Sequence, residues 1–286
     1  MRYQLRHPKI EHRAEREDMG TLYISDLDGT LLNRNAQISE YTRETLNNLI
    51  DKGMLFSYAT ARSQTSSGEV TKGLGVKLPI IVYNGTFVLD PMTGEALLSN
   101  YFGSEVQSLL DDLIAHDIYP IVYSHAEETE RFTYIPEMAS RGVKAHIRNR
   151  KGDHRTHPVE TINQLYTGDI FCVNCIDEPE KLEPMYEKYK DLYHCIYYAD
   201  IYSGEQWLEI MPKTVSKANA VQWLKQYLGC DKVVVFGDQK NDISMFEAAD
   251  ECYAVSNAVK DLKVLATDII HENNEDGVAK WLMEHV

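Results

Sequence analysis

The sequence has no long apolar run. Within its 286 residues, no apolar stretch approaches the roughly 20 residues that a membrane-spanning helix needs. The first 20 residues also lack the apolar segment of a secretory signal, and their acidic residues argue against a transit peptide. We therefore expect a cytoplasmic protein with no membrane partner, and we interpret residues 1–19 as a polar N-terminal extension outside the folded domains.

Cysteine is scarce and odd in number. The chain has five, namely Cys172, Cys175, Cys195, Cys230 and Cys252. Without a secretory signal, an odd count predicts reduced thiols rather than a disulfide framework. Cys172 and Cys175 have the spacing of a redox or zinc pair, but they lie within an apolar run and no second pair completes a zinc site. We interpret them as small buried hydrophobic side chains.

Basic residues are outnumbered. The chain has 29 Lys and Arg against 44 Asp and Glu, which gives a formal net charge of −15. This balance argues against a nucleic-acid partner, because nucleic-acid binding needs a basic surface that displaces counterions from phosphates. The electric field of this net negative charge also repels small anions. An anionic ligand would therefore need local attraction from a metal ion, a few cations or backbone N–H groups.

Many of the basic residues gather in one segment, between Arg141 and His157. Its cations are Arg141, Lys144, Arg148, Arg150, Lys151 and Arg155, with His146, His154 and His157 among them. We interpret the segment as a solvated loop. The alternative is that it offsets the acidic field near the opening of a binding site. The histidines show no regular ligand spacing, so they do not predict a zinc site.

The apolar pattern predicts two kinds of domain. Strands and helices alternate at both ends of the chain, which indicates a doubly wound, mostly parallel α/β sheet. The middle of the chain has a more antiparallel character. We therefore predict a discontinuous core over residues 20–100 and 208–286, and a second α/β domain inserted at 101–207. The predicted core strands are residues 22–25, 54–59, 80–83, 208–211, 232–236, 252–255 and 268–270, and the predicted core helices are 39–52, 216–228, one from about 243 and one from 277.

The strongest motif is Asp26-Leu27-Asp28-Gly29-Thr30, directly after the first predicted strand. Ligands of open α/β sheets bind at the carboxyl ends of strands, so both carboxylates can face a crevice there. A solvated Asp-Gly turn would be the simpler interpretation. That turn explains Asp28 but not Asp26.

Other strand and helix ends carry matching residues. Thr60 follows the strand at 54–59, and Asp238 follows the strand at 232–236, with Asn241 and Asp242 close behind. Lys217 lies in the first turn of the helix predicted from Ser216. The helix dipole disfavours a cation there by about 0.3–1 kcal/mol. A lysine that points where helix N–H groups point is nevertheless a good phosphate anchor, although a solvated surface lysine is the alternative.

Together these motifs resemble the haloacid dehalogenase superfamily, in particular the Cof-type phosphatases with a large α/β cap. The resemblance covers almost the whole chain after residue 20 and includes Tyr83-Asn84-Gly85 and Glu275-Asp276-Gly277-Val278-Ala279. Two positions depart from the family pattern: Ala61 and Ala218 stand where glycine is common. Neither departure removes a reactive group.

The resemblance implies a two-step phosphoryl transfer. Asp26 would attack phosphorus and form an aspartyl phosphate. Asp28 would protonate the leaving alkoxide and then take a proton from the hydrolytic water. Thr60, Lys217 and Asn241 would hold the phosphoryl oxygens.

The resemblance also implies a magnesium ion. Asp26, Asp238 and Asp242 would crowd negative charge beside a phosphate, and hard oxygen ligands favour Mg²⁺. The backbone carbonyl of Asp28 would complete the set. For Asp242, an N-cap on the following helix is the alternative role.

The expected substrate is a small phosphorylated metabolite, either a sugar phosphate or a phosphorylated cofactor. The inserted cap would close over the site and read the leaving group. A phosphomutase and a non-catalytic sensor of phosphorylated metabolites are the alternatives. We expect a monomer or a weak homo-oligomer.

Overall fold

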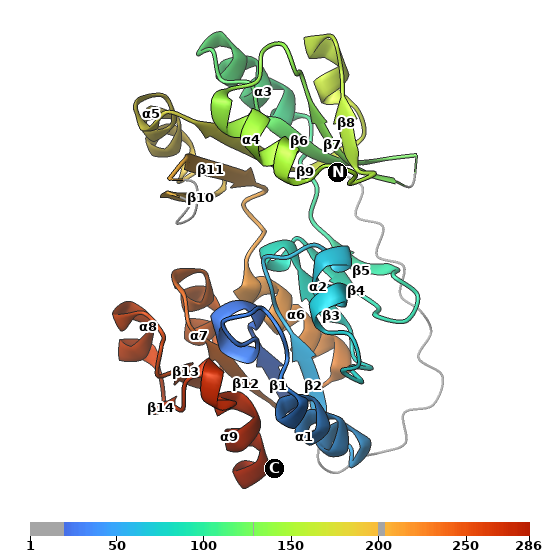
Figure 1. The fold of residues 1–286 in the computed structure, drawn as a ribbon, viewed down its shortest axis with the longest axis vertical. Helices are drawn as coiled ribbons and strands as arrows, with labels where there is room; N and C mark the ends of the chain where they lie inside the picture. The colour runs from blue at the N-terminus through green and yellow to red at the C-terminus, as the bar shows by residue number, and fades with distance from the viewer. Residues whose placement is uncertain (1–19, 128, 200–203) are drawn as a thin grey trace. The chain divides into compact units, whose positions relative to one another are not determined.

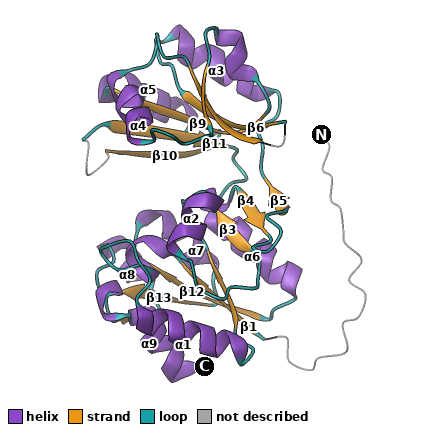
Figure 2. Ribbon diagram, turned by 45° about the vertical axis from the view of Figure 1, so that its right-hand side comes forward, coloured by secondary structure: helices purple, strands orange, loops and turns teal. Residues whose placement is uncertain are grey.

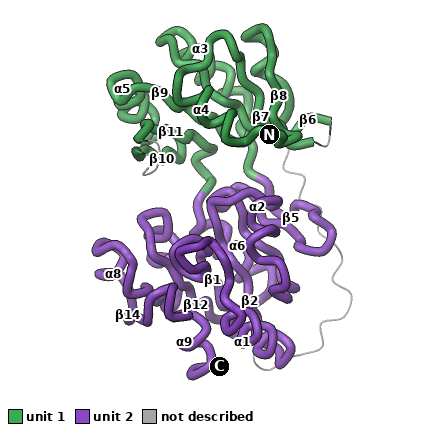
Figure 3. The backbone as a smooth tube through the Cα atoms, in the orientation of Figure 1, with its two compact units in different colours: residues 1, 100–215 green, residues 2–99, 216–286 purple. Residues whose placement is uncertain are grey.

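The computed structural model describes residues 20–127, 129–199 and 204–286. The predicted extension over residues 1–19 lies outside the described residues. The described chain forms two compact units, one from residues 20–99 and 216–286 and one from residues 100–215 (Figure 3). We call them the core unit and the inserted unit.

The core unit is built on a five-stranded parallel sheet with the strand order β14-β13-β12-β1-β2 (Figure 1). Its strands are β1 (Thr21–Ser25), β2 (Leu55–Tyr58), β12 (Lys232–Gly237), β13 (Glu251–Val255) and β14 (Asp268–Ile270). The central strands are apolar in sequence because both of their faces are covered. Leu22, Ile24, Val233 and Val235 are accordingly fully buried.

Helices cover both faces of this sheet. They are α1 (Glu40–Asp51), α2 (Gln64–Val70), α6 (Lys217–Leu228), α7 (Ile243–Ala248), α8 (Lys260–Leu265) and α9 (Gly277–His285). Helix α1 packs on α9, and α6 packs on α7. The crossover from β1 to β2 runs one way along the sheet and the crossover from β12 to β13 runs the other way. Right-handed crossovers therefore place α1 and α7 on opposite faces, which confirms the predicted doubly wound fold.

A small antiparallel sheet extends the core unit. It contains β3 (Ile80–Val82), β4 (Phe87–Leu89) and β5 (Ala96–Ser99). A parallel bridge between Ala59 and Ile81 joins this sheet to the end of β2. The tight turn Tyr83–Gly85 separates β3 from β4. Strands β4 and β5 thus form a hairpin.

The inserted unit has a six-stranded sheet (Figure 2). Its strand order is β10-β11-β9-β6-β7-β8. Its strands are β6 (Ile121–Ala126), β7 (Thr129–Tyr134), β8 (Thr156–Pro158), β9 (Asp169–Asp177), β10 (His194–Ala199) and β11 (Gln206–Met211). All neighbouring strands are antiparallel except β7 and β8. Its helices are α3 (Glu105–Ala115), α4 (Arg141–Asn149) and α5 (Pro179–Tyr189).

The inserted unit has a core of its own on one face of its sheet. Leucines of α3 and α5 pack there against Val173 and Cys175 of β9. Helix α4 lies on the opposite face, since Gly142 approaches the side chain of Ile176, which alternates with Cys175 along the strand. The described cysteines are all free thiols, and Cys172 and Cys175 are buried in β9. The interpretation of this pair as small buried hydrophobic residues is thus confirmed.

The observed boundary between the units differs from the prediction at its second crossing. The strand predicted at 208–211, assigned from sequence to the core, pairs as β11 with β9 and β10 of the inserted sheet. The inserted unit therefore ends at residue 215 rather than 207. An apolar run predicts a strand but does not say which sheet it joins. The interpretation of the basic segment from Arg141 to His157 as a solvated loop was also wrong for its first nine residues, because they form α4.

Candidate active site

The two central strands of the core sheet bring Asp26 and Asp238 together. β1 pairs with β12, and the backbone N–H of Asp26 donates to the carbonyl oxygen of Phe236 at 2.9 Å. The crossovers leave these two strands in opposite directions, so their carboxyl ends form the switch point where open α/β sheets bind ligands. Both side chains are buried, with 5% of Asp26 and 4% of Asp238 exposed.

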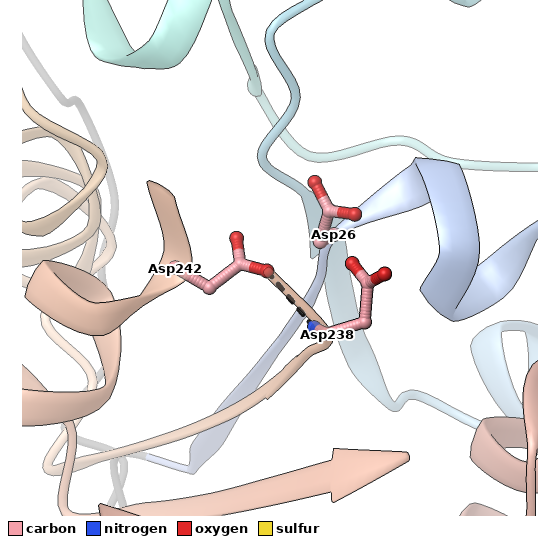
Figure 4. A group of neighbouring side chains, drawn as sticks. All are labelled: Asp26, Asp238 and Asp242. Atoms are coloured by element: carbon pink, nitrogen blue, oxygen red, sulfur yellow. Dashed lines mark hydrogen bonds between the residues drawn. The ribbon is translucent and has the colours of Figure 1, made fainter. Parts of the chain in front are cut away.

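A third carboxylate completes the group. Asp26, Asp238 and Asp242 each offer an oxygen, and these atoms lie within 4.8 Å of one another (Figure 4). The Oδ2 atom of Asp242 accepts hydrogen bonds from the backbone N–H groups of Asp238 and Gln239, at 2.9 and 3.1 Å. Asp242 therefore binds back to its own turn. The alternative of a side-chain cap on α7 was wrong, since Asp242 makes no such bond.

Lys217 faces two of these carboxylates. Its Nζ atom donates to Asp26 Oδ1 at 2.5 Å and to Asp242 Oδ1 at 2.7 Å, and the lysine is only 1% exposed. Ser216 caps α6 by accepting the N–H of Asn219, which places Lys217 at the first helical position. The alternative of a solvated surface lysine was wrong.

The turn Tyr83–Gly85 supports the start of α6. A Cβ atom on Gly85 would lie 2.3 Å from the carbonyl oxygen of Ser216. Gly85 also has a φ of +96°, a conformation that favours glycine. Only glycine therefore lets the turn approach the residue before Lys217 so closely.

The charges in this group do not balance. The group contains one ammonium and three buried carboxylates. Burial, together with Asp242 and Asp238, raises the pKa of Asp26 well above its ordinary value, although Lys217 opposes the shift. Burial and the charge of Asp242 raise the pKa of Asp238 to about 7. Burial alone would lower the pKa of Lys217, but Asp242 and Asp26 outweigh it and raise that pKa. The group as a whole therefore carries surplus negative charge.

This surplus suits a divalent cation. Carboxylate oxygens are the ligands that Mg²⁺ and Ca²⁺ prefer. Asp238 makes no salt bridge with Lys217 in the described chain, and the bond that its carboxylate accepts from the Thr30 hydroxyl is long, at 3.3 Å. Gly29 keeps the space beside it open, since a Cβ there would lie 2.2 Å from Asp238 Oδ2. The residues present therefore fit a bound cation.

Asp28 is not part of the buried group. Its side chain is 52% exposed and forms a two-pronged ion pair with Arg62, at 2.7 Å from Nε to Oδ2 and 2.6 Å from Nη2 to Oδ1. The sequence analysis did not identify Arg62 as a site residue. Its position two residues after Thr60, at a strand end, was the available signal.

Thr60, Asn84 and Asn241 form a second polar cluster. The Thr60 carbonyl accepts the Asn84 N–H at 2.9 Å, and the Asn241 side-chain amide donates to Asn84 Oδ1 at 3.2 Å. Tyr83 and Asn84 both have positive φ, at 50° and 53°. Such strain collects at functional sites, so Asn84 joins Thr60 and Asn241 as a candidate.

The chain is similar to known proteins along most of its length. The family model for haloacid dehalogenase-like hydrolases matches residues 23–282. The chain belongs to this family. Two relatives from Bacillus subtilis (strain 168) are the 5-amino-6-(5-phospho-D-ribitylamino)uracil phosphatases YwtE and YitU. YwtE is 28% identical over 90% of this chain and 95% of its own length, and YitU is 27% identical over 92% and 97%. The crystal structure of TM0651 from Thermotoga maritima is 28% identical, covers 94% of this chain and 98% of its own, and has a TM-score of 0.74.

Family membership confirms the resemblance drawn from the motifs. The two departures of this haloacid dehalogenase-like hydrolase from the family pattern can also be placed. Ala61 is exposed to solvent and Ala218 is half-buried at the second position of α6. Neither methyl group is buried in the carboxylate group. No described helix of this hydrolase is long and apolar enough to cross a membrane.

Proposed function

We propose that this hydrolase is a Mg²⁺-dependent phosphatase that cleaves small-molecule phosphate monoesters through an aspartyl-phosphate intermediate. The observation that carries the proposal is the buried group of Asp26, Asp238 and Asp242 beside Lys217 at the switch point of the sheet. Three carboxylates with one ammonium form a poor binding site for a phosphate unless a cation joins them. With a cation they form a good one.

Asp26 is the proposed nucleophile. Lys217 occupies its Oδ1 atom, which leaves Oδ2 for attack on phosphorus. The bond from Oδ2 to phosphorus forms as the bond from phosphorus to the leaving oxygen breaks. Water then attacks the aspartyl phosphate, releases inorganic phosphate and restores the carboxylate.

Asp28 is the proposed acid and base. It gives a proton to the leaving oxygen in the first step and takes one from water in the second. The two-pronged ion pair with Arg62 fixes the direction of the Asp28 carboxylate.

The remaining polar groups of the site would bind the phosphoryl oxygens. We assign them to Lys217, Thr60 and Asn241, with Asn84 aligning Asn241. Asp26, Asp238 and Asp242 and the backbone carbonyl of Asp28 would hold the Mg²⁺. When bound, the ion neutralises the surplus charge and polarises the phosphoryl group. Both oxygens of Asp242 already accept hydrogen bonds, so its contribution is chiefly charge.

The first substrate to test follows from the relatives. YwtE and YitU are named as phosphatases of 5-amino-6-(5-phospho-D-ribitylamino)uracil, a phosphate ester of a ribityl chain on a heterocycle. We propose that class, phosphorylated cofactor precursors, together with sugar phosphates.

The test is phosphate release from a panel of such esters with Mg²⁺. We expect Asp26→Asn to fall below about one thousandth of the wild-type rate. The matched control is Asp51→Asn, whose carboxylate is 74% exposed and pairs only with Lys77, and it should keep full activity. Wild-type activity in Asp26→Asn would disprove the nucleophile. Isomerised product without free phosphate would indicate a phosphomutase, and binding without turnover a sensor.

A further inference from the structure

The inserted unit carries a basic segment that the proposed reaction does not use. Residues 138–152 contain five Lys and Arg and no Asp or Glu, although the chain as a whole has a net charge of −15. Most of these cations lie on or directly after α4. The inserted unit therefore presents a local positive field within an acidic protein.

Two of the charges of α4 oppose its own stability, although Arg148 lies in the last turn, where the dipole favours a cation. Arg141 is its first residue and Lys144 its fourth, at the end of the helix where the dipole disfavours cations. Lys144 and Arg148 are four residues apart, so their like charges lie side by side and repel. A segment that breaks such local rules without a structural gain marks a functional position.

Three of these cations have no salt-bridge partner among the described residues. Arg141 forms a salt bridge with Glu205 at 3.3 Å. No described carboxylate forms a salt bridge with Lys144, Arg148 or Lys151, and all three side chains are exposed. Their charge is available to an external anion.

Two adjoining hollows run along α4 among these cations. One, of about 540 Å³, lies over Tyr134 and Pro136 beside Lys144 and Arg148. The other, of about 530 Å³, is lined by Arg148, Lys151 and the start of β8. Both share Ile147 and Arg148, so they form one surface, which we call the basic groove. It combines an apolar floor with a cationic rim.

The walls of the basic groove are held in place. Ser140 caps α4 by accepting the N–H of Val143 at 3.0 Å, and its hydroxyl also donates to the carbonyl oxygen of Ile176. Gly142 lies so close to β9 that a Cβ there would be 2.5 Å from Ile176 Cγ2. Because α4 is clamped to the sheet at its first turn, a ligand need not pay to order it.

We propose that the basic groove binds a small organic anion, a molecule with a phosphate-, sulfonate- or carboxylate-type group on an apolar body. Each hollow falls within the roughly 300–1,000 Å³ of metabolite sites. The apolar body of such a molecule would contact the floor of the groove, and its anionic group would contact the cations of the rim. A long polyanion such as RNA is disfavoured, because it would also meet the acidic remainder of the surface. All groove residues belong to the inserted unit, and the aspartates Asp26, Asp238 and Asp242 belong to the core unit.

Calorimetric titration of the full chain with naphthalene-1-sulfonate tests the proposal. This probe has the required chemistry but no ester bond for a phosphatase to cleave. We expect saturable binding that the double variant Lys144→Ala, Arg148→Ala weakens at least tenfold. The matched control is Lys181→Ala, Lys188→Ala on α5, which removes the same charge from cations that pair with Asp177 and Asp112. It should change the affinity less than twofold.

Further arms separate charge from apolar contact. Ile147→Ser should weaken the binding of naphthalene-1-sulfonate. Sulfate ion and neutral 2-naphthol should bind the wild type at least tenfold more weakly than naphthalene-1-sulfonate does. Asp26→Asn should bind the probe as the wild type does. Equal losses in the α4 and α5 variants, equal binding of 2-naphthol, loss of binding in Asp26→Asn, or tighter binding of a short RNA would each overturn the proposal. Thermal melting of every variant shows that it is folded.

Discussion

At the residue scale, Lys217 carries a full charge where almost no water reaches it. Its ammonium stands between Asp26 and Asp242, both themselves buried. Removing one partner of such an ion pair costs more than the pair contributes, because the remaining charges are left buried and uncompensated. The lysine therefore serves stability as well as chemistry.

Lys217→Met should lower the free energy of unfolding by about 3–5 kcal/mol without Mg²⁺, and should abolish phosphatase activity. Urea denaturation measures the first effect and phosphate release the second. The control Lys232→Met removes a lysine that is 41% exposed and pairs with Glu251, so it should cost at most about 1 kcal/mol. Equal losses in the two variants would contradict the role given to Lys217.

Arg62 pairs with Asp28, the proposed acid and base. Its guanidinium grips Asp28 at two points, but the pair is partly exposed, with 23% of Arg62 and 52% of Asp28 accessible. Arg62→Ala should therefore change the free energy of unfolding by less than about 1 kcal/mol.

The same variant should lower kcat about tenfold, because an unpositioned Asp28 transfers protons less well. Arg62→Lys, which keeps the charge but loses the fork, should recover only part of the rate. Steady-state kinetics measures both effects. An unchanged kcat in Arg62→Ala would show that the pair has no part in the reaction.

At the scale of elements, the turn Tyr83–Gly85 connects Thr60, Asn241 and the start of α6. Gly85→Ala combines a strained φ with a Cβ placed 2.3 Å from the Ser216 carbonyl. Gly53→Ala offers a matched control, because Gly53 has a similar φ of +106° but nothing within 4 Å of its Cβ position.

We expect Gly53→Ala to cost about 1 kcal/mol of stability with activity retained. Gly85→Ala should cost about 1–3 kcal/mol more, because of the steric contact, and should lower activity by moving Lys217. Urea denaturation measures the stability of the two variants, and phosphate release measures their activity. Equal effects of the two substitutions would mean that the approach to Ser216 has no importance.

Elements differ in how well the sequence predicts them. The long apolar patterns of α1 and α6 predict helices close to the observed bounds. Helices α2 and α4 are short, and each has few apolar residues that could mark it as a helix. The strand β11 is predictable as a strand but not as a member of the inserted sheet, since pairing depends on contacts far along the chain.

The candidate site shows the same division. Asp26, Asp238 and Lys217 lie at element ends that parallel topology must bring together, so their meeting follows from their positions. The ion pair of Asp28 with Arg62 and the bond of Asn241 to Asn84 depend on side-chain directions in turns. No sequence period encodes those directions.

At the scale of the whole molecule, the surplus charge couples cation binding to pH. The pKa of Asp238 is about 7 in the folded protein, against an ordinary value of 3.8. Its carboxyl therefore destabilises the metal-free fold as pH rises from about 4 to about 7, since folding holds the proton more tightly than the unfolded chain does. Below pH 7 the proton also competes with a cation for the same oxygens.

The rise in Tm produced by 5 mM Mg²⁺ over EDTA should accordingly be several degrees at pH 8 and near zero at pH 5.5. Differential scanning fluorimetry measures it, and the difference between paired samples removes all other titrations. Asp238→Asn should show no rise at either pH. A rise that is the same at both pH values in the wild type would disprove the coupling.

The two places where the chain enters and leaves the inserted unit are joined. The side chains of Asn100 and Thr214 are hydrogen bonded at 2.8 Å, although 114 residues separate them in sequence. Ends that touch can be closed by a short linker at little entropic cost. Residues 100–215 thus form a detachable module, which could be exchanged between hydrolases of this family without opening the host sheet.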